Sequence, residues 1–507
     1  MSAVRQAFGG LRPSIPAIAT TLLLIAAGAT AVLAFAPFGW YPLAVLALAI
    51  LFNQWLSDSP CQAFWHGGLF GLGFFGAGVS WVYVSVHSYG HVMLPVAAMI
   101  AALFILVLAV FPAGLGYLAR RYFPAPELQS LLLVFPAGWL LAEWLRGWIF
   151  TGFPWLDIGA SQIDSPLAGY LPLLGEFGVS WLVAVTAGAL LCLLRDRRRA
   201  TVLLLPVLIW GSGTWLDRQE WTSPRGEAIG VSLVQGNVAQ EDKWLPENMQ
   251  ATLVRYAEMS FDGTHSDVYV WPETAIPAFY DQVDESYIPY LQEQLEEQGA
   301  ALLTGVPVLE RDSWQYYNGI VALGQAPAFY YKQHLVAFGE YLPLRWLIGD
   351  TLDALAVPNA DFTPGNAGQP LLQAAGYPIG TSICFEIAFG SLIAAVVPEA
   401  AMLVNVSNDG WFGDSLAPHQ HLDIARVRAK ETGRPLLRAT NTGISAIIDH
   451  HGEILARSTQ FEQVVVRGEV VPMLGETPFV RFGNWPVLVI AVLSFLVVFL
   501  RRSQAKT

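Results

Sequence analysis

Long apolar stretches occupy both ends of this 507-residue chain and leave a more polar segment between them. A membrane-spanning helix needs about 20 apolar residues. Only 13% of the residues are charged, against about 25% in soluble globular domains. The pattern predicts an integral membrane protein with seven spans before the polar segment and one after it. These spans are expected near residues 14–34, 40–57, 62–86, 92–118, 128–148, 168–194, 200–216 and 484–500.

Basic residues near the ends of the predicted spans indicate their orientation, because Lys and Arg accumulate in short cytoplasmic loops. They precede the first span and follow the fourth, sixth and eighth. The four clusters are Arg5 with Arg12, Arg120 with Arg121, Arg195 with Arg197, Arg198 and Arg199, and Arg501 with Arg502 and Lys506. Eight spans put all four on one side, which predicts cytoplasmic termini and a polar segment outside. The net charge of -13 argues against nucleic acid as a partner.

The polar segment alternates short β-like runs with polar helical stretches, a pattern typical of an α/β domain. We therefore divide the chain into a transmembrane bundle (1–218), an outer domain (219–477) and a last span with its tail (478–507). The expected strands are 228–235, 267–273, 301–308, 318–323, 328–332, 378–384, 401–407, 443–449 and 464–471, and the expected helices are 247–260, 285–299 and 417–435.

Three of the expected strands end in reactive side chains. Glu273, Lys332 and Cys384 each stand at or just beyond the carboxyl end of a strand, where sites of α/β sheets form. Cys61 and Cys192 lie in apolar stretches, so Cys384 has no evident disulfide partner. No CxxC or Cys/His spacing indicates zinc, and we expect neither a metal nor a cofactor. A buried core thiol and a nucleophile both remain open for Cys384 at this point.

The three residue types together suit acyl transfer. A glutamate within hydrogen-bond reach can take the proton of a thiol, and a lysine can face the oxyanion of a tetrahedral intermediate. The backbone N–H of Phe385, directly after Cys384, is a plausible second oxyanion donor. Taken singly, Glu273 and Lys332 would be read as surface charges. The sequence around the three residues favours the catalytic interpretation.

The segments WPETAIP (271–277), YYKQHLVAFGEYLP (330–343) and SICFEIAFG (382–390) resemble the nitrilase superfamily, whose sites use a Glu–Lys–Cys triad. NVSNDGWFGDSLAPHQHLDIARVRAKETGRPLLRATNTGISAIID, VQGNVAQEDKW (234–244) and EWLRGWIFTGFPWLDIG (143–159) resemble one member family, the apolipoprotein N-acyltransferases of the bacterial inner membrane. The resemblance covers almost the whole chain.

This resemblance implies an α/β fold, a nitrilase-like αββα sandwich inserted in an eight-helix transmembrane bundle and facing the periplasm. It implies that a cysteine takes an acyl chain from a phospholipid, typically phosphatidylethanolamine. The thioester then passes the chain to the amino group of the S-diacylglyceryl cysteine that begins an apolipoprotein. We expect a monomer in the inner membrane, with phospholipid and diacylated apolipoprotein as its partners.

Residue by residue, the resemblance makes Glu273 the general base, Lys332 the stabiliser and Cys384 the nucleophile. Glu340 and Glu386 match acidic residues that support the site, and Trp244 matches a tryptophan on a mobile loop at the entrance. Phe385 stands where related sequences often carry Tyr, which puts a hydroxyl role there in doubt. Ala337 stands where Pro is common, so this loop is expected to be less stiff.

Several features outside the triad carry expectations of their own. Residues 336–349 are expected to dip toward the membrane. The loop 144–166 supplies Trp144, Trp148, Phe153 and Trp155, as an interface belt or as the floor of a lipid groove. Glu143 and Arg146 are expected to pair with each other. His419 and His421 are expected to be structural.

Two other functions use the same residues or the same architecture. A membrane-tethered amidohydrolase or nitrilase would use the same triad with water as the second nucleophile. A transporter or receptor would carry a catalytically inactive outer domain, which an intact triad disfavours. The membrane half distinguishes the acyltransferase from the amidohydrolase, since a hydrolase of soluble substrates does not need eight spans.

Overall fold

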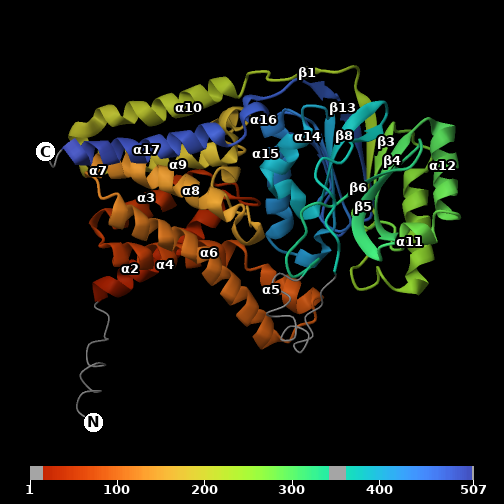
Figure 1. Ribbon diagram of the computed structural model, residues 1–507, viewed down its shortest axis with the longest axis horizontal. Coiled ribbons are helices and arrows are strands. Elements are labelled where there is room, and N and C mark those ends of the chain that lie inside the picture. The colour runs from red at the N-terminus through yellow and green to blue at the C-terminus, as the bar shows by residue number, and fades with distance from the viewer. Residues whose placement is uncertain (1–14, 342–360, 505–507) are drawn as a thin grey trace, which may run out of the picture.

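A computed structural model describes residues 15–341 and 361–504 of the chain. Figure 1 shows a bundle of apolar helices at one end of the molecule and a layered α/β unit at the other. The bundle contains α2 (Ile15–Ala31), α3 (Pro42–Ser57), α4 (Pro60–Gly78), α6 (Leu94–Tyr122), α8 (Phe135–Arg146), α9 (Leu171–Arg195), α10 (Leu204–Leu216) and α17 (Trp485–Gln504).

Each predicted span coincides with an apolar helical segment, but the segments differ in length. Within the described residues, five helical stretches are long and apolar enough to cross a membrane, and a sixth results if one bent pair counts as a single span. Two further apolar helices, 18–34 and 42–57, are shorter. Many leucines and valines of the bundle face outward, including Leu103, Leu106, Val207 and Leu493, as expected of surfaces solvated by lipid tails.

The bent pair departs from the continuous span predicted over 62–86. Helix α4 ends at Gly78, and the next helical stretch, from Val82 to Tyr89, runs at 58° to it. The bend places the indole of Trp81 against the rings of Trp155 and Phe412, at centroid distances of 5.3 and 4.8 Å. Contacts with the α/β unit therefore redirect a segment whose hydropathy alone favours one straight helix.

The α/β unit contains two sheets of six strands each among the described residues. The first has the order β13-β2-β3-β4-β5-β6 and the second β12-β11-β10-β9-β8-β7. β2, β3 and β4 run parallel, as do β8, β9 and β10. The strands are β2 (Ile229–Gln235), β3 (Val268–Val270), β4 (Ala301–Glu310), β5 (Gln315–Leu323), β6 (Ala328–Tyr331), β7 (Leu372–Ala374), β8 (Tyr377–Ile383), β9 (Met402–Ser407), β10 (Leu436–Thr440), β11 (Ala446–Ile448), β12 (Ile454–Arg457) and β13 (Val464–Val470).

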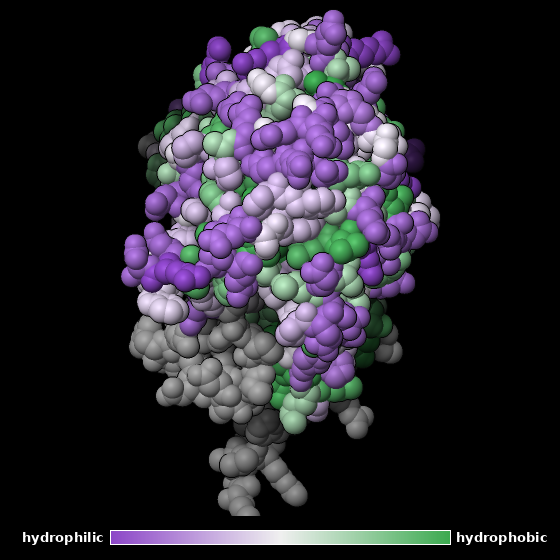
Figure 2. Space-filling model, turned by 90° about the vertical axis from the view of Figure 1, so that its right-hand side faces the viewer, coloured by the Kyte–Doolittle hydropathy of each residue, from purple (hydrophilic) through white to green (hydrophobic). Residues whose placement is uncertain are grey.

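The two sheets pack face to face and helices cover both outer faces (Figure 1). The shared core joins Leu233, Val270 and Leu303 of the first sheet to Val404 and Leu437 of the second. Helices α11 (Pro246–Ser260) and α12 (Tyr287–Gln298) cover the first sheet, while α14 (Gly390–Val396) and α15 (Ala417–Thr432) lie between the second sheet and the bundle. The architecture is the expected four-layer αββα sandwich. Figure 2 shows that its outer end, beyond α11 and α12, is largely hydrophilic.

A buried ion cluster joins α15 to the bundle helix α9. The guanidinium of Arg428 lies 2.6 Å from a carboxylate oxygen of Glu176 and 2.6 Å from one of Glu431. The backbone N–H of Glu176 also donates to Oε1 of Glu431 at 2.6 Å. Arg428 is 1% exposed, so the two carboxylates depend on this guanidinium for compensation.

Replacing Arg428 by Met should therefore destabilise the junction. Two buried carboxylates would lose their counter-charge, a change that costs about 3–5 kcal/mol, and thermal unfolding of the detergent-solubilised protein should begin several degrees lower. Arg467→Met is the matched control, because Arg467 makes a partly exposed 2.7 Å pair with Asp262 of a kind that contributes about 0–1 kcal/mol. Equal melting temperatures for the two variants would contradict the assigned role of the cluster.

Candidate active site

The three predicted catalytic residues meet at the seam between the two sheets. Glu273 lies shortly after β3, Lys332 directly follows β6 of the same sheet, and Cys384 directly follows β8 of the other. All three are buried, with exposed fractions of 8%, 1% and 9%. Nζ of Lys332 lies 3.8 Å from Oε1 of Glu273, and the charges of both act on the Cys384 thiol. Residues far apart in the chain thus form one enclosed group.

The carboxylate of Glu273 is held by one hydrogen bond on each oxygen. The side-chain amide of Asn318 donates to Oε1 at 2.8 Å, and the backbone N–H of Asn408 donates to Oε2 at 2.9 Å. Lys243, also buried, donates from Nζ to the backbone carbonyl of Glu273 at 3.0 Å. Each oxygen of Glu273 keeps acceptor capacity for a transferred proton. Sequence reasoning missed Lys243, because it sits in a polar loop segment, beside Trp244, that reads as solvent-exposed.

Lys332 is a permanent cation in this site. Its Nζ lies 2.9 and 2.8 Å from the two carboxylate oxygens of Glu340. Burial opposes the ammonium charge, but the charges of Glu340 and Glu273 outweigh burial and raise the pKa of Lys332. Glu340 is itself fixed, since Asn318 donates to Oε1 at 2.9 Å and the N–H of Val336 to Oε2 at 2.8 Å. The supporting residue predicted at 340 therefore orients the lysine directly.

The backbone at Cys384 is unusual. Its φ is +53°, a region that costs energy for a residue with a side chain and that is common at functional sites. Its carbonyl accepts hydrogen bonds from Nδ2 of Asn405 at 3.3 Å and from Nε2 of His421 at 3.2 Å. Phe385 follows in the first turn of a 3-10 helix (Cys384–Ala388), where backbone N–H groups lack partners within the helix. This position leaves the N–H of Phe385 able to serve a ligand.

The thiol of Cys384 is protonated at rest. Burial and the charge of Glu273 raise its pKa to about 12, although the ammonium of Lys332 acts in the opposite direction. A preformed thiolate–lysine pair is therefore not the resting state. The carboxylate of Glu273, whose charge acts on this thiol, is a group of the kind that can accept such a proton.

A second buried network stands behind the nucleophile. Nδ1 of His421 lies 3.0 Å from Oδ1 of Asp409 and 2.9 Å from the guanidinium of Arg438, and Arg438 also pairs with Asp409 at 2.8 Å. The other ring nitrogen of His421 contacts the carbonyl of Cys384. His421 is structural, as expected, and its structural task is to hold the backbone of the nucleophile.

Glu386 fixes the segment after Lys332 against the segment around Cys384. It is fully buried and accepts from the backbone N–H groups of Ile383, Gln333 and His334, at 2.7, 2.6 and 3.0 Å. The hydroxyl of Tyr330 donates to it at 3.0 Å. Glu386 thus supports the site through the backbone on both sides.

The bundle contributes aromatic side chains to the surroundings of the nucleophile. The ring of Phe385 stacks on Phe153 and Trp155, at centroid distances of 6.1 and 6.2 Å, so this residue acts through its ring and not through a hydroxyl. Trp144 and Trp148 pack instead on each other, 5.5 Å apart. Two of the four predicted aromatics therefore reach the site and two do not.

The loop that carries these aromatics is braced by Arg146. Its guanidinium pairs with Asp157 at 2.5 Å and donates to the carbonyls of Phe153 and Trp155. Glu143 accepts instead from the indole of Trp139 and from the N–H of Ile158. The predicted Glu143–Arg146 pair is therefore not among the ion pairs of the described residues, because the returning loop offers Arg146 a buried carboxylate that spacing along one helix could not reveal.

Trp244, expected at the entrance, and Phe338, in the segment expected to dip toward the membrane, both lie at the surface. Trp244 is 51% exposed and Phe338 is also 51% exposed. Phe338 has a φ of +64° and donates its N–H to the carbonyl of Tyr341 at 2.8 Å. The rest of the segment expected to dip toward the membrane, 342–349, lies outside the described residues.

The fold and the site define a class: a membrane protein that carries a nitrilase-like carbon–nitrogen hydrolase domain. Residues 230–478 match the family model described as carbon-nitrogen hydrolase, and residues 27–189 match that of the apolipoprotein N-acyltransferase N-terminal domain. Relatives named apolipoprotein N-acyltransferase, from Methylococcus capsulatus and Pseudomonas putida, are 49% and 43% identical, over 92% and 95% of this chain and 93% and 96% of their own. The chain belongs to the apolipoprotein N-acyltransferase family.

A solved structure, Saccharomyces cerevisiae Nit3, described as a member of branch 10 of the nitrilase superfamily, aligns with 50% of this chain and 93% of its own. The TM-score is 0.36 and the sequence identity 18%.

Lys332→Arg should inactivate the protein although the charge is kept. The ammonium sits in a closed cage with Glu340 and Glu273, and a planar guanidinium is larger and directs its donors differently. Loss of one oxyanion donor costs about 100- to 1000-fold in turnover. Single-turnover N-acylation measures this loss, and an unchanged melting temperature shows that the variant is folded. A loss in turnover below about tenfold would show that Lys332 does not contact the oxyanion directly.

The pH dependence of Cys384 alkylation tests the state of the thiol. In a Cys61→Ser, Cys192→Ser background, the iodoacetamide rate should rise about tenfold per unit between about pH 7 and pH 10, without a plateau, because only the thiolate reacts. Glu273→Gln should shift this profile to lower pH, since the carboxylate charge is one cause of the raised pKa. A plateau reached below about pH 8 would mean that Cys384 is a thiolate at rest.

Proposed function

We propose that this protein moves an acyl chain from a phospholipid, through a thioester on Cys384, to the amino group of the S-diacylglyceryl cysteine of an apolipoprotein. The observation that carries the proposal is the enclosed group of Glu273, Lys332 and Cys384, built where aromatic side chains of an apolar bundle reach the nucleophile. Membership of the apolipoprotein N-acyltransferase family supports the same reaction.

In the first half-reaction, Glu273 takes the Sγ proton as sulfur attacks the ester carbonyl of the phospholipid. The ammonium of Lys332 and the N–H of Phe385 face the resulting oxyanion. The intermediate collapses, the ester C–O bond breaks, and Glu273 returns the proton to the departing oxygen. The products are a thioester on Cys384 and a lysophospholipid, and Glu273 is again a carboxylate.

In the second half-reaction, the neutral amino group of the diacylated cysteine attacks the thioester carbonyl. Glu273 removes one N–H proton from the tetrahedral intermediate, which the same two donors stabilise. The C–S bond breaks, and Glu273 gives its proton to the leaving sulfur. The amide product and the resting thiol result, so no external acid, base or cofactor is needed.

The alternative, an amidohydrolase, uses water in place of the amine in the second half-reaction. The triad is compatible with both. The contact of Phe153 and Trp155 with Phe385 favours the transferase, because a nucleophile that borders an apolar bundle is suited to a lipid donor.

We further infer that the protein crosses the inner membrane eight times. The transmembrane bundle comprises residues 1–218, the catalytic domain (219–477) lies in the periplasm, and residues 478–507 form the last span and its tail. Supporting this orientation, Arg195 and Arg199 both pair with Glu127 and Arg502 bonds the carbonyl of Tyr122, at the end of the bundle that Figure 1 places away from the sheets. Basic residues mark the cytoplasmic side. We propose phosphatidylethanolamine as donor and a monomer as the working unit.

The decisive test is capture of the thioester. Purified protein incubated with acyl-labelled phosphatidylethanolamine should retain label that neutral hydroxylamine removes, and a diacylated lipopeptide should then receive it. Cys384→Ser should retain no label and give no product, because a serine hydroxyl is far less acidic than a thiol. Cys61→Ser is the control and should behave as wild type.

Either of two outcomes would contradict the proposal. Hydroxylamine-sensitive label on Cys384→Ser would show that another residue is the nucleophile. Release of the label as free fatty acid, with the lipopeptide present and unmodified, would favour the hydrolase.

A further inference from the structure

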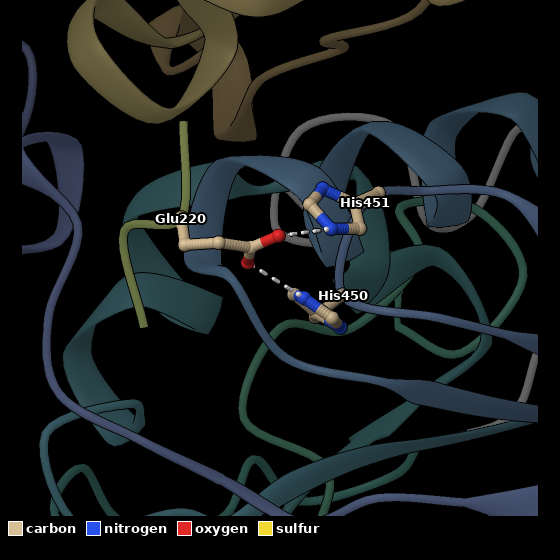
Figure 3. Close-up of side chains that lie close together, drawn as sticks. All are labelled: Glu220, His450 and His451. Carbon is tan, nitrogen blue, oxygen red and sulfur yellow. Dashed lines mark hydrogen bonds and ion pairs between the residues drawn. The ribbon is translucent and has the colours of Figure 1, made fainter. Parts of the chain in front are cut away.

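One carboxylate and two imidazoles converge away from the triad, where the chain leaves the bundle (Figure 3). Glu220 follows the end of α10, and His450 and His451 stand in the turn between β11 and β12. Oε2 of Glu220 lies 3.3 Å from Nε2 of His450, and Oε1 lies 3.2 Å from Nε2 of His451. One ligand atom from each side chain can be chosen so that all three lie within 4.8 Å of one another.

We propose that Glu220, His450 and His451 bind a divalent cation of the zinc type. Imidazole nitrogen and carboxylate oxygen are ordinary zinc ligands at about 2.0–2.2 Å, and tetrahedral ligands at that distance lie roughly 3.3–3.5 Å from one another. The two nitrogen–oxygen separations, 3.3 and 3.2 Å, already have this value. Each separation involves a different oxygen of Glu220, so the two imidazoles must still move toward one common point, and their side chains, 25% and 32% exposed, are free to adjust.

The turn that carries the two histidines is rigid before any ion arrives. Oδ1 of Asp449 accepts from the N–H groups of His451 and Glu453, at 2.9 and 2.8 Å. Nε of Arg426, on α15, donates to the carbonyl of Gly452 at 3.0 Å. A site whose backbone is fixed in advance loses little conformational entropy on binding.

The segment that carries Glu220 is also anchored. The hydroxyl of Thr222 donates to the carbonyl of Gly433 at 3.0 Å, directly after α15. The carboxylate of Glu220 is 63% exposed, so an ion can enter from solvent. The segment that carries Glu220 and the turn that carries the two histidines thus face each other across the candidate site, and hydrogen bonds fix the backbone of each.

The surroundings leave room for a further ligand and do not repel a cation. A pocket of about 20 Å³ adjoins the three side chains and is also lined by Asp217 and Lys430, which is space for about one water as the fourth ligand. The ammonium of Lys430 is neutralised by Asp217, 2.7 Å away.

The same three side chains could instead form only a hydrogen-bonded contact. The two roles differ in where the imidazole protons lie. Without an ion, an Nε2–H of each imidazole donates to a carboxylate oxygen. An ion at this point bonds Nε2 of each imidazole, whose remaining proton then lies on Nδ1; because a protonated imidazole cannot coordinate, binding must weaken as the pH falls. Bound zinc would join the exit of α10 to the β11–β12 turn by coordinate bonds. None of the triad residues lines the pocket, so the ion would stabilise the junction and take no part in acyl transfer.

The test uses the full-length protein without a polyhistidine tag, in detergent, after removal of metals with EDTA. Zinc chloride should bind with one ion per chain by calorimetry and raise the melting temperature, and cobalt chloride should give the intense visible absorption of a tetrahedral Co²⁺ complex. Glu220→Gln and His450→Gln should each weaken binding by about 100-fold or more and abolish the cobalt spectrum. His265→Gln is the matched control, because His265 makes an exposed pair with Asp267 at 3.7 Å, and it should bind zinc as wild type does.

Equal zinc affinity in wild type, Glu220→Gln and His450→Gln would overturn the proposal, as would the absence of a tetrahedral cobalt spectrum in wild type. Both variants retain N-acylation if folded, because neither residue belongs to the catalytic group. If His450→Gln fails to fold, Glu220→Gln decides alone, since this carboxylate is largely exposed and its replacement keeps the shape of the side chain.

Discussion

The buried ammonium of Lys332 is the constraint around which the site is built. A cation that is 1% exposed is tolerated only with nearby negative charge and complete hydrogen bonding. Glu340 and Glu273 supply that charge, and Asn318 donates to both of them. These groups come from different strands and loops of one sheet, and the backbone N–H of Asn408, just after a strand of the other sheet, bonds Glu273, so the full hydrogen bonding of this group requires both sheets.

The same arrangement bears on the division of work proposed for Glu273, Lys332 and Cys384. The negative charges of Glu340 and Glu273 keep Lys332 protonated, whereas burial and the charge of Glu273 raise the pKa of Cys384 and favour the thiol. The resting site therefore contains a protonated Cys384 thiol together with the carboxylate of Glu273. In the proposed reaction, negative charge moves from Glu273 to the new oxyanion when an ester carbonyl arrives, still next to the ammonium. Little reorganisation is needed, which is the condition for strong electrostatic catalysis.

The sequence predicted the parts of the fold that are local. Short β-like runs located nine strands, and proline and glycine signals located α15, because such signals depend only on neighbouring residues. β10 was missed because Arg438 interrupts its apolar run, and the buried partners that make this arginine acceptable, Asp409 and Asn405, belong to a neighbouring strand and its loop.

Of the candidate site, strand ends and residue chemistry indicated Glu273, Lys332 and Cys384. Lys243 was beyond reach, because its role depends on a single contact with a backbone carbonyl 30 residues away. The group of Glu220 with His450 and His451 was hidden for the same reason, since no local motif spans 230 residues.

Helix α15 transmits the position of the membrane bundle to the nucleophile. At its C-terminal end Arg428 and Glu431 bond Glu176 of the bundle. One turn into the helix, Gln420 accepts from the indole of Trp155, and the adjacent His421 contacts the carbonyl of Cys384. A helix bonded to the bundle at both ends cannot tilt without separating buried polar pairs, at a cost of several kcal/mol. The distance of the Cys384 thiol from the bundle is therefore set by the fold. Conformational freedom is correspondingly expected in exposed side chains at the rim of the site, such as Trp244, and not in the attachment of the catalytic domain.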